Sequence, residues 1–374
     1  MEWRDTVSTS QLEIQLIAAI VATACALPGV FLVLRQMAMM SDAISHTVLL
    51  GIVVMFFVVQ SLDSPWLILG AAVTGVLTVS LTELLNRTRL VKHDAAIALV
   101  FPALFSIAVI LISRFARGVH LDVDAVLLGE LAFAPFDRMT ILGLDLPRAL
   151  VVMGVVLLLN SLLIALFYKE LKLATFDAGL AAALGFSPAL IHYGLMAMVS
   201  VTAVGAFDAV GSILVVALMV TPAAAAYLLT NELRRMLIYS VLIGIVSAVG
   251  GYWLARWLDS NIAGSMATVT GIVFLVIFLV APGRGLIALA HRRRSQRWNF
   301  AKTMLTIHLL QHEAGPDADR ESRVDHLVEH LRWQPTHAEQ VIRYAERKGA
   351  VRRQSGRLLL TETGRTIARA ALVQ

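Results

Sequence analysis

The chain has 374 residues, of which 58% are hydrophobic and only 15% are charged, and its mean hydropathy is +0.77. An ordinary soluble domain carries about 25% charged residues, so the composition excludes that class and predicts a polytopic membrane protein. The formal net charge of +5 does not by itself indicate nucleic-acid binding, because basic residues flank apolar segments and set membrane orientation. The single cysteine, Cys25, excludes a disulfide framework or a cysteine metal cluster within one chain.

Nine apolar segments are long enough to cross a bilayer, which takes about 20 helical residues. The sequence before the first segment lacks the basic start of a cleavable signal peptide, so we expect this segment to remain in the mature protein. The predicted spans are 13–34, 41–61, 66–86, 94–113, 143–168, 188–206, 209–230, 236–257 and 262–282.

The charges between the spans predict how the chain crosses the membrane. Basic residues cluster in the links 87–93, 169–187 and 231–235 and in the run HRRRSQR at 291–297, whereas the alternate links are acidic. Basic links stay on the cytoplasmic side. The N-terminus is therefore expected outside and the C-terminus in the cytoplasm.

The link between the fourth and fifth spans, residues 114–142, is too polar to cross the membrane. Its short apolar part at 125–134 predicts a surface or re-entrant helix. Asp122, Asp124 and Glu130 would attract divalent cations to the outer mouth, or they are ordinary solvated loop acids.

The composition divides the chain into three parts: a transmembrane domain at 1–285, a basic linker at 286–298 and a soluble domain at 299–374. Helical patterns in the last part are followed by the run VRRQSGRLLLT, in which Ser355-Gly356 predicts a hairpin turn. The order helix-helix-helix-hairpin-helix is that of a winged helix. The expected fold is thus an all-α polytopic membrane protein of about nine spans with a small cytoplasmic winged-helix-like α+β domain.

The strongest chemical signal is a carboxylate and an imidazole inside a predicted span. Asp42 and His46 are four residues apart, so they share one helix face. Carboxylate plus imidazole suits divalent manganese, iron or zinc, and ionisable groups in a membrane are costly unless they have a function. We predict a metal site here; the alternative is a pair that only holds neighbouring helices together.

The cytoplasmic link 174–187 is rich in small residues and too short to span the membrane. With one flanking residue on each side, its sequence is LATFDAGLAAALGFSP. It predicts a docking helix that lies in the membrane plane, with large side chains entering a partner's groove and small ones allowing close approach. A connecting helix without special purpose is the alternative. The residues assigned to this surface are Phe176, Asp177, Ala181, Leu184 and Gly185.

Half of the ten histidines lie in the soluble tail. His308 and His312, and likewise His326 and His330, are spaced as ligand pairs on a helix. We hypothesise that cytosolic metal binds here and slows transport; the alternative is a set of solvated histidines, because no cysteine or tight acid cluster accompanies them.

Four runs occur in order along the chain, namely MSDAISHTVLLGI, HDAAIALVFPALFSIAVILIS, TFDAGLAAALGF and VGSILVVALMVTPAAAAYLL. Together they resemble the permease subunit of the zinc/manganese/iron family of ABC importers, over about 1–285. The resemblance implies that Asp42 and His46 belong to the metal path and that 174–187 is the coupling helix that contacts the ATPase.

The resemblance also implies partners: a second permease chain, cytoplasmic ATP-binding subunits, an extracytoplasmic metal-binding protein and the lipid of the bacterial inner membrane. The sequence holds no GxxxxGKS or GxxxxGKT phosphate loop, so we expect a transport subunit that is not itself an enzyme. Manganese or zinc, or else iron, is the expected transported ion, and no resident cofactor is expected.

The soluble tail resembles the winged-helix domain of metal-dependent transcriptional repressors. The run that carries this resemblance is HAEQVIRYAERKGAVRRQSGRLLLTETGRTIARA. Its basic excess is small, and a membrane-tethered domain has poor access to a chromosome, so we do not expect nucleic acid as a partner. The alternative functions are a membrane-bound metal-responsive regulator acting through this domain and a passive cation channel. The basic residues that would face phosphates are Arg343, Arg347, Lys348, Arg352, Arg353 and Arg357.

Overall fold

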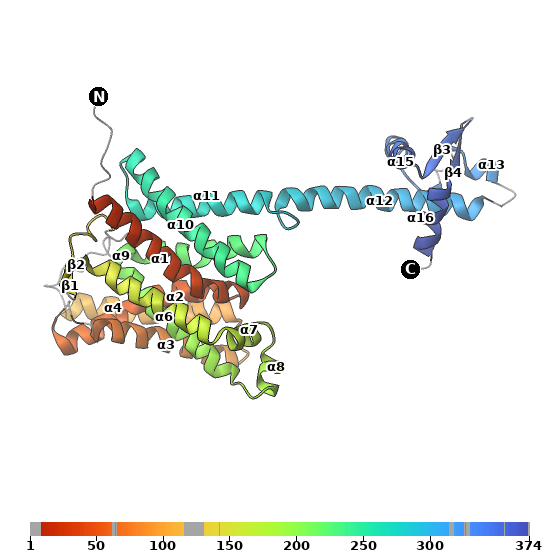
Figure 1. Cartoon of the computed structure of the whole chain (residues 1–374). Coiled ribbons are helices and arrows are strands. Elements are labelled where there is room, and N and C mark those ends of the chain that lie inside the picture. Colours follow the sequence, from red (N-terminus) through yellow and green to blue (C-terminus); the bar gives the residue numbers. More distant parts are fainter. Residues whose placement is uncertain are drawn as a thin grey trace, which may run out of the picture. The chain divides into compact units, whose positions relative to one another are not determined.

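The computed structural model describes residues 9–61, 64, 66–115, 131–141, 143–313, 318–324, 326, 330–354 and 356–372. Their contacts separate two compact units, Met1–Ala281 and Pro282–Gln374, and each is described by itself below (Figure 1).

Within the described residues, the first unit contains nine helical segments long and apolar enough to cross a membrane, which confirms the predicted number. In lipid, a single stretch of about 20 apolar residues can pair all of its backbone N–H and C=O groups only by forming a helix. The helices are α1 (Thr9–Leu34), α2 (Ala38–Val59), α3 (Trp66–Arg87), α4 (His93–Phe115), α6 (Arg148–Leu166), α9 (Pro188–Leu229), α10 (Leu233–Leu258) and α11 (Ile262–Val280).

The helix α9 holds two of the nine segments, Pro188–Phe207 and Ala209–Leu229. Its backbone breaks at Gly211, where φ is +76° and ψ is +163°. A residue with a Cβ rarely adopts this conformation, whereas glycine does so at little cost. The predicted seventh span starts at residue 209, so the break lies just inside it, and α9 continues through the predicted link at 207–208.

The core of this unit is formed by closely packed helices, and α1 lies against α6, α9 and α10. A Cβ added to Gly29 of α1 would lie 1.8 Å from the Met219 carbonyl oxygen of α9. Another added to Gly51 of α2 would lie 2.3 Å from the Gly70 carbonyl oxygen of α3. Small residues at such crossings let helix backbones approach closely, which is how helices gain packing energy in a membrane.

A few buried polar side chains also join the helices. The Asn160 side chain on α6 is fully buried and donates to the Ala24 carbonyl oxygen at 3.1 Å and to the Thr202 hydroxyl at 2.8 Å. The Thr78 hydroxyl lies 2.7 Å from that of Thr47, which joins α3 to α2. Such bonds contribute about 0.6 kcal/mol each in a bilayer, so each adds modestly to the stability of the helix bundle.

A short hairpin precedes α6 and was not predicted. Strand β1 (Arg138–Ile141) pairs antiparallel with β2 (Leu144–Pro147), and Gly143 in the turn has a φ of +82°. The Arg138 guanidinium donates to Asp145 within the hairpin at 2.7 Å and to Glu13 at the start of α1 at 3.2 Å. The hairpin and the start of α1 therefore lie at the same end of the helices.

Most of the predicted helix at 125–134 lies outside the described residues, as do Asp122, Asp124 and Glu130. The described part, residues 131–134, forms a turn.

Two short helices join α6 to α9: α7 (Tyr168–Phe176) and α8 (Ala178–Ala183). The sequence predicted one helical link, but the backbone at Asp177 is extended, with a φ of −150°. The Asp177 carboxylate accepts a hydrogen bond from the Leu180 backbone N–H at 2.8 Å. Asp177 is thus the N-cap of α8, a position that aspartate favours because it satisfies an otherwise unpaired N–H group.

The second unit begins with a long helix, α12 (Leu286–His312). Residues 286–298, which the sequence predicted as a linker, form the first half of this helix; the run is basic, but it contains no glycine or proline that would break a helix. The other elements are α13 (Ala318–Glu321), α15 (Pro335–Arg347), β3 (Val351–Gln354), β4 (Arg357–Leu360) and α16 (Glu362–Leu372).

A small separate core holds the second unit together. Leu305 of α12, Val341 and Ile342 of α15 and Leu358 of β4 are nearly or fully buried and pack together. The strands β3 and β4 pair antiparallel, which confirms the predicted hairpin. The Arg365 guanidinium of α16 forms an ion pair with Glu313, directly after α12, at 2.6 Å.

Candidate functional site

Asp42 and His46 lie in the first half of α2, as the sequence predicted. The Asp42 Oδ1 and His46 Nε2 atoms are 3.4 Å apart, and the two side chains are 38% and 28% exposed. The Ser45 hydroxyl donates its hydrogen bond to the Asp42 backbone carbonyl at 2.8 Å and not to the Asp42 carboxylate. Both side chains therefore keep free ligand atoms and an open side.

Two phenylalanines of α4 line the imidazole of His46. The Phe101 ring stacks on it with the ring centres 5.7 Å apart, and the Phe105 ring meets it edge-on at 5.8 Å. These contacts restrict the rotation of the imidazole and place it beside an apolar wall. The sequence analysis did not single out either phenylalanine as a site residue.

The pair has the geometry of two ligands of one ion. Two ligand atoms bound at about 2.1 Å with a tetrahedral angle between them lie about 3.4 Å apart, which matches the separation of the Asp42 and His46 atoms. Two ligands do not complete a coordination sphere. In the described part of the chain, groups of three or more possible ligand residues occur only in the second unit.

The predicted coupling residues do not all face the same way. Phe176 and Leu184 are 60% and 61% exposed, so both are free to contact another molecule. Ala181 is fully buried; its small size lets α8 lie close to the chain's own helices. Gly185 follows α8 with a φ of +87°, which turns the chain toward α9.

A long-range hydrogen bond connects this region to the start of α2. The Arg35 Nε atom, in the short link before α2, donates to the Thr175 hydroxyl of α7 at 3.2 Å. The Arg35 guanidinium also lies 3.5 Å from the His192 Nδ1 atom of α9. Its Nη2 atom is buried and finds no hydrogen-bond partner among the described residues. The link that leads into the metal pair is thus held by the helix next to α8.

The structure brings all four predicted tail histidines together in the second unit, around a residue that the sequence analysis missed. Glu321 of α13 forms one group of possible ligands with His308 and His312 of α12 and a second group with His326 and His330; the His308 and His330 rings are in contact, with their centres 5.1 Å apart. Burial, followed by the charge of His312, lowers the pKa of His308. Burial acts to raise the pKa of Glu321, but the hydrogen bond and charge of His326 lower it overall.

These features are those of a multi-pass membrane permease: within the described residues, nine helical segments long and apolar enough to span a membrane, a carboxylate–imidazole pair in one of them and an exposed helical segment between two others. The family comparison agrees. The model of the ABC 3 transport family matches residues 11–281, which is nearly the whole first unit. The chain belongs to the ABC 3 transport family.

Curated relatives extend this result. The chain is 48% identical over 361 residues to the zinc transport system membrane protein TroD of Treponema pallidum, covering 96% of this chain and 98% of that protein. It is 51% identical over 269 residues to the manganese transport system membrane protein MntD of Bacillus subtilis, covering 72% of this chain and 91% of that protein. The first alignment covers nearly the whole chain, including most of the second unit.

A solved structure has the same fold. PsaBC from Streptococcus pneumoniae, in complex with Fab, superposes with a TM-score of 0.64 at 28% identity, covering 75% of this chain and 95% of that chain. The predicted alternative of a membrane-bound regulator gains no support from these comparisons, because the family and both relatives are named for transport.

Proposed function

We propose that the chain is the membrane-spanning permease of an ATP-driven importer of divalent transition metal ions, with zinc or manganese the first candidates and iron the next. The observation that carries the proposal is the Asp42–His46 pair, which has the separation of two ligands of one ion inside a span of a transport-family protein. The names of the relatives, which include zinc, manganese and chelated iron transport proteins, support these metals.

The pair acts as a transient stop for the ion. A carboxylate and an imidazole replace part of the hydration shell that the ion loses on entering the membrane. Because the described residues provide only two ligands there, the ion keeps water or gains ligands from elsewhere, and it leaves once hydration competes. Conduction needs binding of this moderate strength, since a complete ligand set would trap the ion.

The exposure of the pair supports a second permease chain. Asp42 and His46 are both about one-third exposed in the single chain, although a metal path through lipid needs protein on all sides. A second copy or a related chain packed against this face would close the path. It would also supply the missing ligands.

The charge pattern supports an orientation with the N-terminus outside and the C-terminus in the cytoplasm. In this orientation α7, α8 and the Arg35 link lie on the cytoplasmic side, where ATP-binding subunits would dock. The exposed Phe176 and Leu184 side chains would enter a groove of such a subunit. The chain lacks a phosphate-binding loop of its own, so hydrolysis falls to that subunit, and an extracytoplasmic metal-binding protein would deliver the ion.

Movement of the docked segment has a direct route to the metal pair. The Arg35–Thr175 hydrogen bond joins α7 to the link before α2, and Asp42 lies in the second turn of α2. A displacement of α7 by the ATPase would pull on this link. The start of α2 would then shift between an outward-facing and an inward-facing arrangement.

The order of the described elements, from α12 through α15 and the β3–β4 hairpin to α16, supports a winged-helix fold for the second unit, and we assign it that fold. Several arginines predicted to face phosphates are engaged within the unit: Arg353 pairs with Glu339 at 2.8 Å, and Arg357 pairs with Asp319. This pairing argues against nucleic acid as a partner, since phosphate contacts need free cationic groups.

Reconstitution into vesicles with a cognate ATP-binding subunit and metal-binding protein tests the proposal. We expect uptake of labelled zinc or manganese that requires hydrolysable ATP and that persists, at least in part, after residues 282–374 are removed. Uptake without nucleotide would favour a passive channel. Loss of all uptake on removal of the second unit, with assembly intact, would favour a regulator.

A further inference from the structure

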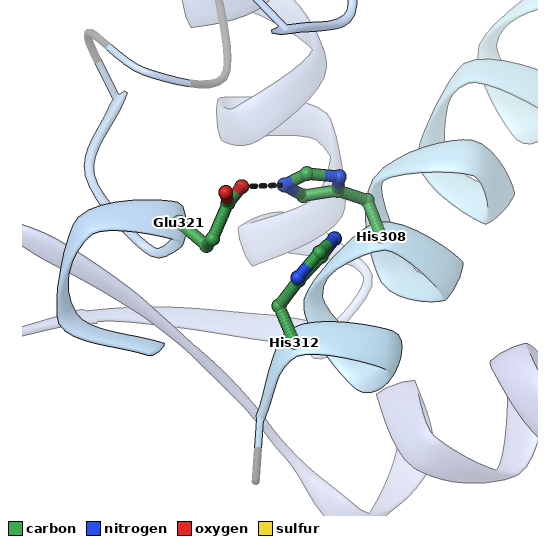
Figure 2. Close-up of side chains that lie close together, drawn as sticks. All are labelled: His308, His312 and Glu321. Carbon is green, nitrogen blue, oxygen red and sulfur yellow. Dashed lines mark ion pairs between the residues drawn. The ribbon is translucent and has the colours of Figure 1, made fainter. Parts of the chain in front are cut away.

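Five possible metal ligands converge on one point in the second unit, a feature that the import mechanism does not use. Figure 2 shows His308 and His312, which project from successive turns of α12 toward Glu321 of α13. His326 and His330 approach the same carboxylate from the segment that follows α13. Glu321 thus belongs to two groups of three ligands, each with all ligand atoms within 4.8 Å of one another.

The distances around Glu321 match those between ligands of a shared ion. The Glu321 carboxylate oxygens lie 3.3 Å from His308 Nε2, 3.0 Å from His326 Nε2 and 3.6 Å from His330 Nδ1. The ring nitrogens of His326 and His330 are 3.5 Å apart. Two nitrogen or oxygen ligands on a tetrahedral zinc lie about 3.4 Å apart, so small shifts suffice to bring these atoms onto an ion.

Two buried atoms at the centre lack hydrogen bonds. In the described part of the chain, neither His308 Nε2 nor Glu321 Oε2 has a hydrogen-bond partner, and these side chains are only 7% and 13% exposed. The two atoms form an ion pair only when His308 is protonated, and a buried polar atom without a hydrogen bond is costly and needs an explanation. Because the two atoms face each other at 3.3 Å, one ion between them would satisfy both.

The donor set favours one class of ion. Four imidazoles and one carboxylate form a nitrogen-rich set, which suits zinc, whereas manganese and magnesium prefer mainly oxygen ligands. We propose that Glu321 and its surrounding histidines form a resident Zn²⁺ site, separate from the transport path, that ties α12 to α13 and to His326 and His330.

The site provides a way to sense the imported metal. With the C-terminus in the cytoplasm, as the proposed function has it, the second unit faces the compartment that receives the ion. Its occupancy would then rise with the delivered metal, and the bound ion would hold α12, α13, His326 and His330 to one another. The binding site itself does not depend on the import proposal.

Metal binding to the full-length chain in detergent tests the site. The purified protein is stripped with a chelator, titrated with Co²⁺ as a spectroscopic probe and then with Zn²⁺, and the metal retained after gel filtration is counted. We expect the wild type, and the Asp42→Ala variant, to retain Zn²⁺ and to show the visible bands of four-coordinate Co²⁺.

Variants of the cluster locate the ion. We expect His308→Ala/His312→Ala to weaken Zn²⁺ binding by at least about 100-fold, since loss of even an outer partner of a ligand costs 10–100-fold. The matched control is His291→Ala, an exposed histidine on the same helix, which should bind as the wild type does. Glu321→Gln keeps the side-chain size and removes the shared charged ligand, so it provides a second variant if the double alanine variant misfolds.

Two results would overturn the proposal. One is Zn²⁺ retention by Glu321→Gln and by folded His308→Ala/His312→Ala that equals the wild type. The other is a wild-type chain whose retained Zn²⁺ disappears with Asp42→Ala, because that ion would belong to the membrane pair. Since binding is measured without transport, failure of this proposal and failure of the import proposal are distinguishable.

Discussion

The hydrogen bond between Arg35 and Thr175 gives the sharpest prediction of the coupling mechanism. Thr175→Val keeps the shape of the side chain but removes the hydroxyl that accepts from Arg35 Nε at 3.2 Å. The buried Nη2 atom of the same guanidinium already lacks a partner among the described residues, so the variant leaves a second donor unsatisfied. Such a loss costs about 1–3 kcal/mol.

If this hydrogen bond couples ATP hydrolysis to transport, its removal should lower metal uptake more than it lowers the rate of ATP hydrolysis. A coupling free energy of about 1–3 kcal/mol corresponds to about 5–150-fold. We therefore expect Thr175→Val to lower the metal imported per ATP hydrolysed by at least about 5-fold, while the ATPase subunit still docks and hydrolyses ATP. The assay is simultaneous measurement of labelled metal uptake and phosphate release in reconstituted vesicles.

A double-mutant cycle with Arg35→Met separates this bond from other effects. When two side chains act through one contact, the double variant should lose no more than the worse single variant. The matched control is Thr268→Val in α11, whose hydroxyl bonds only to the Gly264 carbonyl of its own helix. Unchanged uptake per ATP in Thr175→Val, or losses in the two single variants that multiply in the double variant, would refute the reasoning.

Three further predictions concern packing, acid stability and regulation. Gly29→Ala places a Cβ 1.8 Å from a backbone oxygen, so we expect thermal unfolding in detergent to show that the free energy of unfolding falls by about 1–3 kcal/mol. The control Gly154→Ala, whose added Cβ has no described atom within 4 Å, should show no such loss. Equal stabilities of the two variants would contradict the close packing. The hydrogen bond from Arg365 lowers the pKa of Glu313 below its ordinary 4.5, so the stabilisation that this ion pair gives the fold is present above pH 4.5 and is lost as the pH falls through the lowered pKa. Unfolding scans should therefore show Glu313→Gln to be less stable than the wild type at neutral pH but not in acid. A difference in stability that does not change with pH would contradict this prediction. Zn²⁺ trapped on the cytoplasmic side of vesicles should slow uptake by the wild type but not by Glu321→Gln, and equal slowing of both would exclude regulation through this cluster.

The spans and the proximity of Asp42 to His46 were predictable because both depend on local sequence. Hydropathy and length define a membrane helix, and the i, i+4 spacing of Asp42 and His46 places them on one face whatever else the fold does. A boundary between the sixth and seventh spans was predictable, since acidic Asp208 interrupts the apolar run, but the backbone break itself lies a few residues later, at Gly211.

The surroundings of the site were not predictable from local patterns. Arg35 and Thr175 are 140 positions apart, and the phenylalanines beside His46 belong to another helix. Glu321 stood out in no local pattern, because its ligand partners come from α12 and from the segment after it. The sequence signal was limited to the histidine pairs. The helical state of the basic run at 286–298, which the sequence predicted as a linker, was not predicted, because charge does not reveal helix continuity.

In the proposed mechanism a divalent metal ion crosses the membrane through the Asp42–His46 pair. The most direct test is ATP-dependent uptake of labelled zinc and manganese by the reconstituted complex, with wild-type, Asp42→Ala, His46→Ala and control His291→Ala chains at equal assembly. We predict that uptake is lost in both pair variants and retained in the control, and that the preferred label identifies the transported metal. Wild-type uptake rates in assembled Asp42→Ala and His46→Ala complexes would contradict this mechanism.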